Sequence, residues 1–258
     1  MKDATINLDY RSFPRVLDPR IHYFSNNWFQ MNRPAFTQFS RQLTRKEKIR
    51  RILEIGSFEG RSSLFWLEEY PRAHITCIDP FLNDGTDHVE RKNDACKKIF
   101  LHNTHHYRNR VTLLEGKSTD LLPKLWEAGK KYDLIYIDGS HLSNVVLSDL
   151  YYAGLMARKG GYILLDDYMH YNHEYPSLRH LSPGVAINTY FRITYPHCFR
   201  PVYVAYSIGF EKTEEVPHEK RRMEATMKRF DEATNQEVSW LTKWKAMDEK
   251  ANKRFWGK

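Results

Sequence analysis

Short apolar runs rich in β-branched residues alternate with helical patterns through the middle of this chain, and this alternation constrains the fold more than any other feature. The runs predict strands at residues 51–55, 74–78, 111–114, 134–137 and 162–165, and the segments between them predict helices at 62–70, 87–102, 118–128 and 143–158. Gly160-Gly161 is expected to end the last of these helices, Pro183 to open another, and residues 202–206 and 208–210 to form closing strands. Repeated strand-helix units predict an α/β fold, a doubly wound, mostly parallel seven-stranded sheet with helices on both faces.

The length of 258 residues suits one full-sized domain with extensions at both ends. The alternating pattern assigns the domain to residues 51–210. Residues 1–50 form a basic and aromatic extension, and residues 211–258 form an amphipathic helical tail rich in Lys and Glu. The tail is expected to pack on the domain or on a second copy of the chain. In the second case the protein would be a homo-oligomer.

Neither a membrane protein nor a disulfide-stapled one is expected. No stretch approaches the roughly 20 apolar residues of a membrane-spanning helix, and the polar start MKDATINLDY lacks the apolar core of a secretion signal. The three cysteines are scattered and form no C-x-x-C pair. These features predict a soluble cytoplasmic protein with no membrane partner.

The net charge of +8 is concentrated at the N-terminus, where residues 1–50 hold 10 Lys and Arg against 4 Asp and Glu. Residues 51–210 are balanced. A basic arm can steer an anionic substrate or bind nucleic acid. We favour the alternative interpretation, in which these Lys and Arg side chains form an ordinary solvated surface.

A glycine-rich turn joins the first predicted strand to its helix, in the order Glu54, Gly56, Ser57, Gly60 and Ser62. Such a turn lets the backbone approach a ligand closely, while Glu59 within it disfavours a pyrophosphate. The second predicted strand ends at Asp79, where open α/β sheets place the carboxylate that binds ribose hydroxyls. A nucleoside without phosphates fits this pattern, and an ordinary tight turn is the alternative.

Three carboxylates follow the next two strands, Asp138 after one and the pair Asp166-Asp167 after the other. The carboxyl ends of parallel strands meet at the ligand-binding edge of the sheet. Clustered like charges need compensation, and Mg²⁺ prefers carboxylate and water oxygens. A magnesium site is therefore predicted; the alternative is that Asp138 caps its helix and one of the pair is solvated.

The turn motifs resemble the class I S-adenosylmethionine-dependent methyltransferases, whose fold is Rossmann-like. Glu54, Gly56, Gly60 and Asp79 match the pattern that holds the methionine and the ribose, and residues 111–125 look like the third strand and following turn of catechol-type O-methyltransferases. The resemblance implies S-adenosylmethionine as cofactor and assigns its contacts to Glu54, Gly56, Ser57, Gly60, Ser62, Asp79, Ser118, Thr119 and Asp138. Taken alone, Ser118 is also a good helix N-cap.

The acidic strand ends resemble metal-dependent small-molecule O-methyltransferases of the catechol and sugar types. That resemblance implies Mg²⁺ bound by Asp138, Asp166 and Asp167, with His141 as the general base. An imidazole beside a metal-bound hydroxyl is suited to accept its proton. The catechol type has an aromatic residue at the position of Ser140 and Asn at that of Asp167, so catechol is not the implied acceptor.

These features favour an Mg²⁺-dependent O-methyltransferase acting on a hydroxylated small molecule, such as a sugar-containing or phenolic metabolite. The N-terminal extension would form a lid or the substrate side of the site. A nucleic-acid methyltransferase that uses the basic arm is a less favoured alternative, because Asp-Gly-Ser-His stands where base N-methyltransferases carry Asn or Asp before Pro-Pro. A noncatalytic interaction protein with the same fold is the third.

Overall fold

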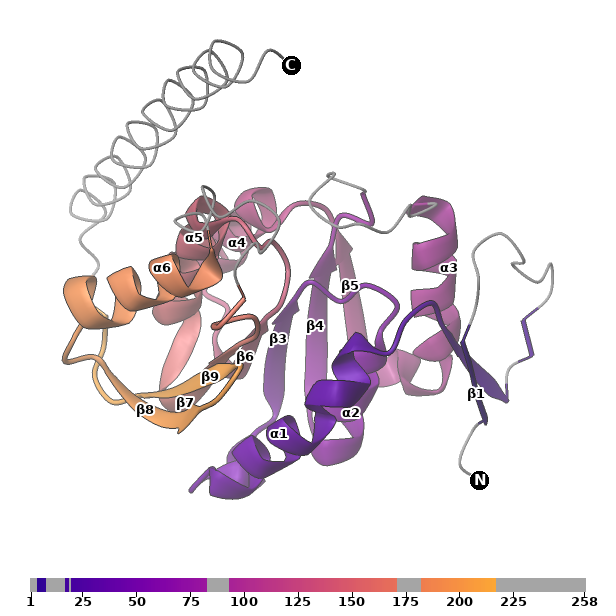
Figure 1. Ribbon diagram of the computed structural model, residues 1–258, viewed down its shortest axis with the longest axis horizontal. Helices are drawn as coiled ribbons and strands as arrows, with labels where there is room; N and C mark the ends of the chain where they lie inside the picture. The colour runs from indigo at the N-terminus through magenta and orange to yellow at the C-terminus, as the bar shows by residue number, and fades with distance from the viewer. Residues whose placement is uncertain (1–3, 8–16, 19, 83–92, 171–181, 217–258) are drawn as a thin grey trace, which may run out of the picture.

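The structure is a computed structural model that describes residues 4–7, 17–18, 20–82, 93–170 and 182–216. Within them the main sheet has seven strands in the order β5-β4-β3-β6-β7-β9-β8 (Figure 1). The first five strands in this order are parallel, and β9 and β8 are antiparallel additions. The strands are β3 (Arg51–Ile55), β4 (His74–Asp79), β5 (Val111–Glu115), β6 (Tyr132–Ile137), β7 (Ala157–Leu165), β8 (Phe199–Val204) and β9 (Ile208–Lys212).

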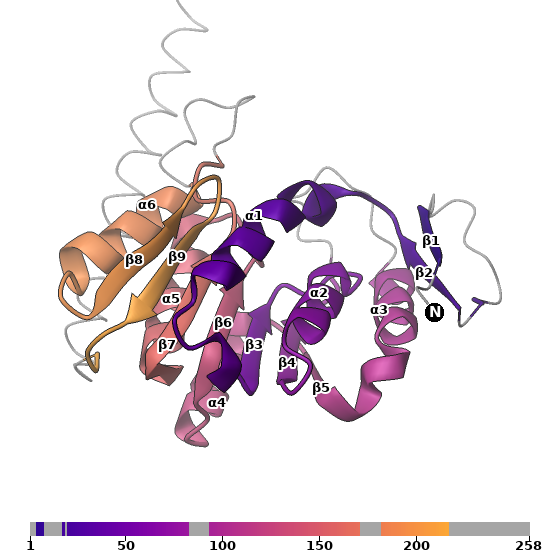
Figure 2. The same ribbon diagram turned by 90° about the horizontal axis from the view of Figure 1, so that it is seen from below.

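Helices cover both faces of the sheet (Figures 1 and 2). One face carries α1 (Trp28–Gln42), α2 (Arg61–Glu69) and α3 (Asn93–Asn103), and the other carries α4 (Ser118–Glu127), α5 (Ser143–Met156) and α6 (Pro183–Asn188), with short turns η2 (Lys46–Lys48), η3 (His105–Arg110) and η5 (Thr189–Thr194). Side chains alternate along each strand, so β6 supplies both cores. Leu134 and Tyr136 pack beneath α1 and α2, whereas Ile135 and Ile137 pack beneath α4 and α5.

The predicted doubly wound, mostly parallel sheet is confirmed, and all seven predicted strands are present within a few residues of their expected bounds. The helix expected at residues 87–102 is observed from Asn93, and residues 87–92 lie outside the described part of the chain. The tail proposed for residues 211–258 is described only to residue 216. Its first two residues, Glu211 and Lys212, are the end of β9. Among the described helices, none has the length and apolar character needed to cross a bilayer.

The end of α5 differs from the prediction. The helix ends at Met156, and β7 begins at Ala157, so Gly160-Gly161 lies within a strand and not at a helix end. Lys131 Nζ donates to the Leu155 carbonyl at 2.6 Å and satisfies one terminal carbonyl of the helix. The pairing of β6 with β7 shifts register just before Leu134, and Gly160, with φ +75°, provides the irregular backbone there.

The N-terminal extension is anchored beside the turn that follows β3. It contains a parallel pair, β1 (Ala4–Asn7) and β2 (Ile21–Phe24), which the sequence did not predict, followed by α1. Asn103 accepts the Tyr23 N–H at 3.0 Å and donates to the carbonyls of Tyr23 and Glu59, both at 2.8 Å. The Ser25 N–H donates to Glu59 Oε2 at 2.7 Å. These bonds attach the extension to the predicted cofactor turn.

Gly56, in the turn after β3, lies very close to the backbone that follows β6. Its φ is +87°, and a Cβ there would lie 2.1 Å from the Asp138 carbonyl oxygen. Gly129 also has a positive φ, +67°, but a Cβ there would meet nothing within 4 Å. Gly129→Ala therefore adds only backbone strain, whereas Gly56→Ala also forces two backbone segments apart.

We expect Gly56→Ala to lower the free energy of unfolding by at least about 2 kcal/mol more than Gly129→Ala does. Urea unfolding of both variants, followed by circular dichroism, measures the difference. Equal losses for the two variants would show that the close approach of Gly56 to Asp138 does not constrain the fold.

Candidate functional site

The turn after β3 forms a cradle at the carboxyl edge of the sheet. The Gly56 N–H donates to the Ile78 carbonyl at 2.9 Å, and the Asp138 N–H donates to the Ile55 carbonyl at 2.8 Å, so three strand ends are joined there. Gly60, with φ +81°, precedes α2. A Cβ at Gly56 would meet the backbone of Asp138, and a Cβ at Gly60 would press on Phe100 and Thr104, so the close packing of this turn favours glycine at both positions.

Asp79, the last residue of β4, connects the turn after β3 with the turn after β4. Its carboxylate accepts the Phe58 N–H at 2.8 Å and the Phe81 N–H at 2.7 Å. Both phenylalanines have positive φ, 46° for Phe58 and 48° for Phe81. Non-glycine residues adopt this conformation at a cost, and such strain gathers at ligand sites.

Glu54 lies fully buried beneath the cradle. It accepts hydrogen bonds from Ser63 Oγ and, at 3.4 Å, from Cys77 Sγ. Burial raises the pKa of Glu54, and the neighbouring serines oppose that rise. Glu54 Oε1 and Ser57 Oγ are buried without a hydrogen-bond partner among the described residues. A ligand in the cradle that carries hydrogen-bond donors would satisfy both atoms.

Ser118 and Thr119 begin α4, at the end of the sheet where the adenine is predicted to bind. The N-cap is Lys117 and its side chain makes no capping bond, so the expected N-cap role of Ser118 is wrong by one residue. Ser118 is the first residue of the helix because the chain is still extended at Lys117, with ψ 140°.

Asp149, which the sequence reasoning missed, lies behind this turn on α5. Its side chain is fully buried, and neither carboxylate oxygen has a hydrogen-bond partner among the described residues. Burial raises the pKa of Asp149 to about 7, and the nearby Ser118 hydroxyl lowers it only in part. An Asp at a buried position of a helix pattern is the signal that could have identified it.

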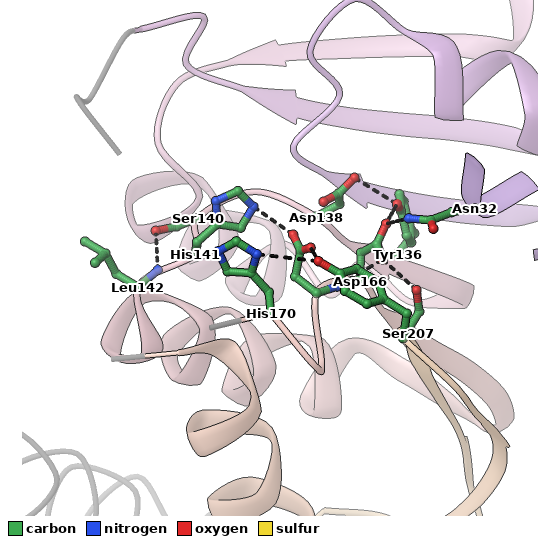
Figure 3. Close-up of polar contacts among 11 residues, drawn as sticks. Asn32, Tyr136, Asp138, Ser140, His141, Leu142, Asp166, His170 and Ser207 are labelled. Atoms are coloured by element: carbon green, nitrogen blue, oxygen red, sulfur yellow. Dashed lines mark hydrogen bonds and ion pairs between the residues drawn. The ribbon is translucent and has the colours of Figure 1, made fainter. Parts of the chain in front are cut away.

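The three carboxylates at the ends of β6 and β7 come together, but in two arrangements (Figure 3). Tyr136, two residues before Asp138 on the same face of β6, lies 2.8 Å from Asp138 Oδ2 and 2.9 Å from Asp166 Oδ2. Asn32 of α1 approaches the same Asp166 oxygen at 3.4 Å. The phenol of Tyr136 therefore links the first Asp to the first member of the pair.

Asp167 points in another direction because its backbone is left-handed, with φ 56°. Its Oδ2 lies 2.7 Å from His141 Nε2, and its Oδ1 accepts the Tyr206 hydroxyl at 2.8 Å. Ligand atoms of Asp138, His141 and Asp167 all lie within 4.8 Å of one another. Asp166 is outside this group of three, although Tyr136 connects it to Asp138.

The electrostatics of the cluster are those of crowded carboxylates. Burial and the charge of Asp166 raise the pKa of Asp138 well above its usual range, and burial and the charge of Asp167 raise the pKa of Asp166. Burial alone would raise the pKa of Asp167, but the hydrogen bond and charge interaction with His141, together with the Tyr206 hydrogen bond and the interaction with His170, outweigh burial and lower that pKa. The cluster therefore favours added positive charge, either a proton or a cation.

The donor set suits a hard divalent cation. The Tyr136 hydroxyl has one hydrogen and faces two carboxylate oxygens, so it can neutralise the contact with only one of them at a time. Each carboxylate oxygen has a second lone pair with which it could bind a metal. Carboxylate oxygens beside an imidazole are ligands found at Mg²⁺ and Mn²⁺ sites.

The contacts around this cluster include side chains that the sequence analysis did not select. Tyr136 could have been found, because period-2 alternation places it on the same face as Asp138. Nothing local in the sequence indicates Asn32, Tyr206 or Ser207. The ring centroid of His170 lies 5.1 Å from that of His141.

The fold and the cradle define the class of the domain. Seven strands in this order, with a glycine turn after β3 and acidic residues after β4, β6 and β7, form the Rossmann-like fold of class I S-adenosylmethionine-dependent methyltransferases. Residues 53–168 match the family model described as a methyltransferase domain. The match covers 116 of the 258 residues, and the sheet has the fold of this class.

A curated relative is an uncharacterized protein of Acanthamoeba polyphaga mimivirus, 32% identical over 121 residues. The match covers 46% of this chain and 52% of the relative, so the chain spans about half the relative's length.

Solved structures of O-methyltransferases share the fold. The MycE methyltransferase from the mycinamycin pathway, solved with Mg, SAH and mycinamycin VI, has a TM-score of 0.51 at 16% identity, over 72% of this chain and 50% of that one. An O-methyltransferase from Bacillus cereus, in complex with SAH, has a TM-score of 0.50 at 18% identity, over 71% and 88%. TomG from Streptomyces achromogenes, in complex with SAM, has a TM-score of 0.50 at 17% identity, over 69% and 80%. Identities this low show a shared fold.

Asp149 makes the stability of the domain depend on pH. The unfolded chain releases this proton near pH 4, whereas the native state holds it to about pH 7. Between these values the native state binds more protons, so stability falls as pH rises from 4 to 7 and stays lower above that. A pKa of about 7 in place of 3.8 lowers the free energy of unfolding above pH 7 by roughly 4 kcal/mol relative to its value below pH 4.

We expect Asp149→Asn to remove this part of the pH dependence. Between pH 5 and pH 8 the wild type should lose more unfolding free energy than the variant, by about 2 kcal/mol or more. Urea unfolding of both proteins at the two pH values provides the comparison, in which the other titrating groups cancel. Parallel losses would mean that Asp149 is already ionised in the native state at pH 5.

Proposed function

We propose that this chain is an S-adenosylmethionine-dependent, Mg²⁺-dependent O-methyltransferase that acts on a hydroxyl group of a small molecule. The observation that carries the proposal is the convergence of Asp138, His141 and Asp167 within 4.8 Å, at the sheet edge that also carries the cradle. Acid and base groups at the ligand-binding edge of such a sheet indicate proton transfer from an acceptor. Two solved O-methyltransferases with the same fold, TomG and the Bacillus cereus enzyme, support this reaction class.

The cofactor would bind along the three turns at this edge. Glu54, Gly56, Ser57, Gly60 and Ser62 would hold its methionine part, Asp79 its ribose, and Ser118 and Thr119 its adenine, with Asp138 at the boundary to the acceptor. The unpaired Glu54 Oε1 and Ser57 Oγ support this assignment, because an ammonium group would satisfy both. Asp149 would support the adenine side through Ser118.

Asp138, Asp166 and Asp167 would hold the Mg²⁺. When bound, the ion supplies a charge that lowers the pKa of an acceptor hydroxyl, and S-adenosylmethionine supplies the methyl group. Tyr136 holds Asp138 and Asp166 at a common oxygen. The left-handed backbone at Asp167 turns its carboxylate toward His141.

His141 would be the general base. With Nε2–H donating to Asp167, the imidazole takes up the acceptor's proton at Nδ1, and the Asp167 carboxylate stabilises the resulting imidazolium. Asp167 therefore serves both to orient His141 and to hold the ion. Helix α1, which places Asn32 beside Asp166, would form the acceptor side of the site.

Replacing His141 tests its role as base. We expect His141→Ala to lower kcat by about 10² to 10⁴, because the acceptor hydroxyl loses its proton acceptor, with little change in the Kd for S-adenosylmethionine. His105→Ala, at an exposed position on η3, is the matched control and should leave both quantities unchanged. A His141→Ala enzyme with wild-type turnover would exclude this residue as the base.

Removing the metal tests the acidic site. We expect excess EDTA to abolish turnover and added Mg²⁺ to restore it, because the uncompensated carboxylates would otherwise repel an acceptor oxyanion. Asp167→Asn should lose the response to Mg²⁺ while still binding S-adenosylhomocysteine in calorimetry. Full activity in excess EDTA would rule out the metal requirement while leaving the methyltransferase assignment intact.

A further inference from the structure

The turn between β8 and β9, residues 205–207, lies against the acidic pair although nearly 40 residues separate them in sequence. The antiparallel register of β7 with β9 pairs Leu165 with Ile208. Continuing that register by one and two residues brings Ser207 opposite Asp166 and Tyr206 opposite Asp167. The sheet topology itself therefore aligns two hydroxyl residues with two carboxylates.

Both hydroxyls bond to the pair. Ser207 Oγ donates to Asp166 Oδ1 at 2.5 Å, and the Tyr206 hydroxyl donates to Asp167 Oδ1 at 2.8 Å. In each case the Oδ1 oxygen is the one held by the turn. The Oδ2 oxygen of Asp166 instead lies 2.9 Å from the Tyr136 hydroxyl (Figure 3). The Oδ2 oxygen of Asp167 lies 2.7 Å from His141 Nε2.

The turn is itself fixed to the loop that it orients. The Met169 N–H donates to the Tyr206 carbonyl at 3.2 Å, and the Ala205 N–H donates to the Ser207 carbonyl at 2.9 Å. Ser207 is buried, so its hydroxyl bond to Asp166 is shielded from water, whereas Tyr206 is 42% exposed at the rim of the site. A buried hydroxyl in a fixed turn positions a carboxylate more strongly than a solvated one does.

We propose that Tyr206 and Ser207 are positioning residues, which hold the Oδ1 oxygens of Asp167 and Asp166. The Oδ2 oxygen of Asp167 is thereby directed toward His141, and that of Asp166 toward Tyr136, which links it to Asp138. This role rests on the metal site of the proposed function. Partners of metal-binding carboxylates typically change metal affinity 10- to 100-fold when they are removed. The strained backbone at Asp167, with φ 56°, is consistent with a side chain held in place from outside its own strand.

Mn²⁺ titration by calorimetry, with no acceptor present, tests the role independently of turnover. We expect Ser207→Ala and Tyr206→Phe each to raise the Kd for Mn²⁺ about 10-fold or more, and Ser207→Thr, which keeps the hydroxyl, to stay within about 3-fold of wild type. Thr213→Ala is the matched control. Thr213 follows the end of β9, and its hydroxyl bonds to the His197 carbonyl and not to the acidic pair.

Turnover gives a second readout in the same variants. Ser207→Ala and Tyr206→Phe should lower kcat at saturating Mg²⁺, while the Kd for S-adenosylhomocysteine and the thermal midpoint stay near those of Thr213→Ala. Variants that bind Mn²⁺ as the wild type does would overturn the positioning role alone. A folded wild type that binds S-adenosylhomocysteine but no Mn²⁺ would overturn the metal site and this role together.

Discussion

The site depends on how three carboxylates can share one edge of a sheet. Parallel strands β6 and β7 end side by side, which brings Asp138 and Asp166 to a single tyrosine hydroxyl. One phenolic hydrogen cannot satisfy two charged oxygens, so the cluster favours added positive charge. A proton on one of the carboxylates or a bound divalent cation would provide it, while His141 lies 2.7 Å from Asp167. The chemistry proposed for the protein follows from this local excess of negative charge.

The rest of the fold supports that edge from three directions. The glycine turn after β3 touches the Asp138 backbone closely enough to exclude a Cβ at Gly56. The β8–β9 hairpin, which adjoins β7 in the sheet, adds hydroxyl donors to Asp166 and Asp167. The N-terminal extension is tied to the cofactor turn through Glu59 and Asn103, and its helix reaches Asp166 through Asn32. The turn after β3 and the acidic cluster are thus parts of one connected structure.

The sequence predicted those parts of the site that lie directly after a strand. Gly56, Asp79, Asp138 and the Asp166-Asp167 pair each follow an apolar run, and strand ends in a parallel sheet converge whatever the rest of the chain does. The divergence of Asp166 from Asp167 was not predictable, because it depends on a left-handed backbone at a non-glycine residue. Tyr206 and Ser207 were missed because antiparallel register joins segments distant in sequence. The strand β2 was missed because it pairs only with the short β1, and Tyr23 within it bonds to Asn103, 80 residues away. The end of α5 was misplaced because a Gly-Gly pair marks a strand irregularity as readily as a helix end.

Anomalous diffraction at the manganese edge, from crystals grown with S-adenosylhomocysteine and Mn²⁺, would show whether the acidic cluster binds a cation. We expect a single strong peak within coordination distance of carboxylate oxygens from Asp138, Asp166 and Asp167, beside the bound cofactor product. Carboxylates that point apart at saturating Mn²⁺, with no peak between them, would contradict this expectation.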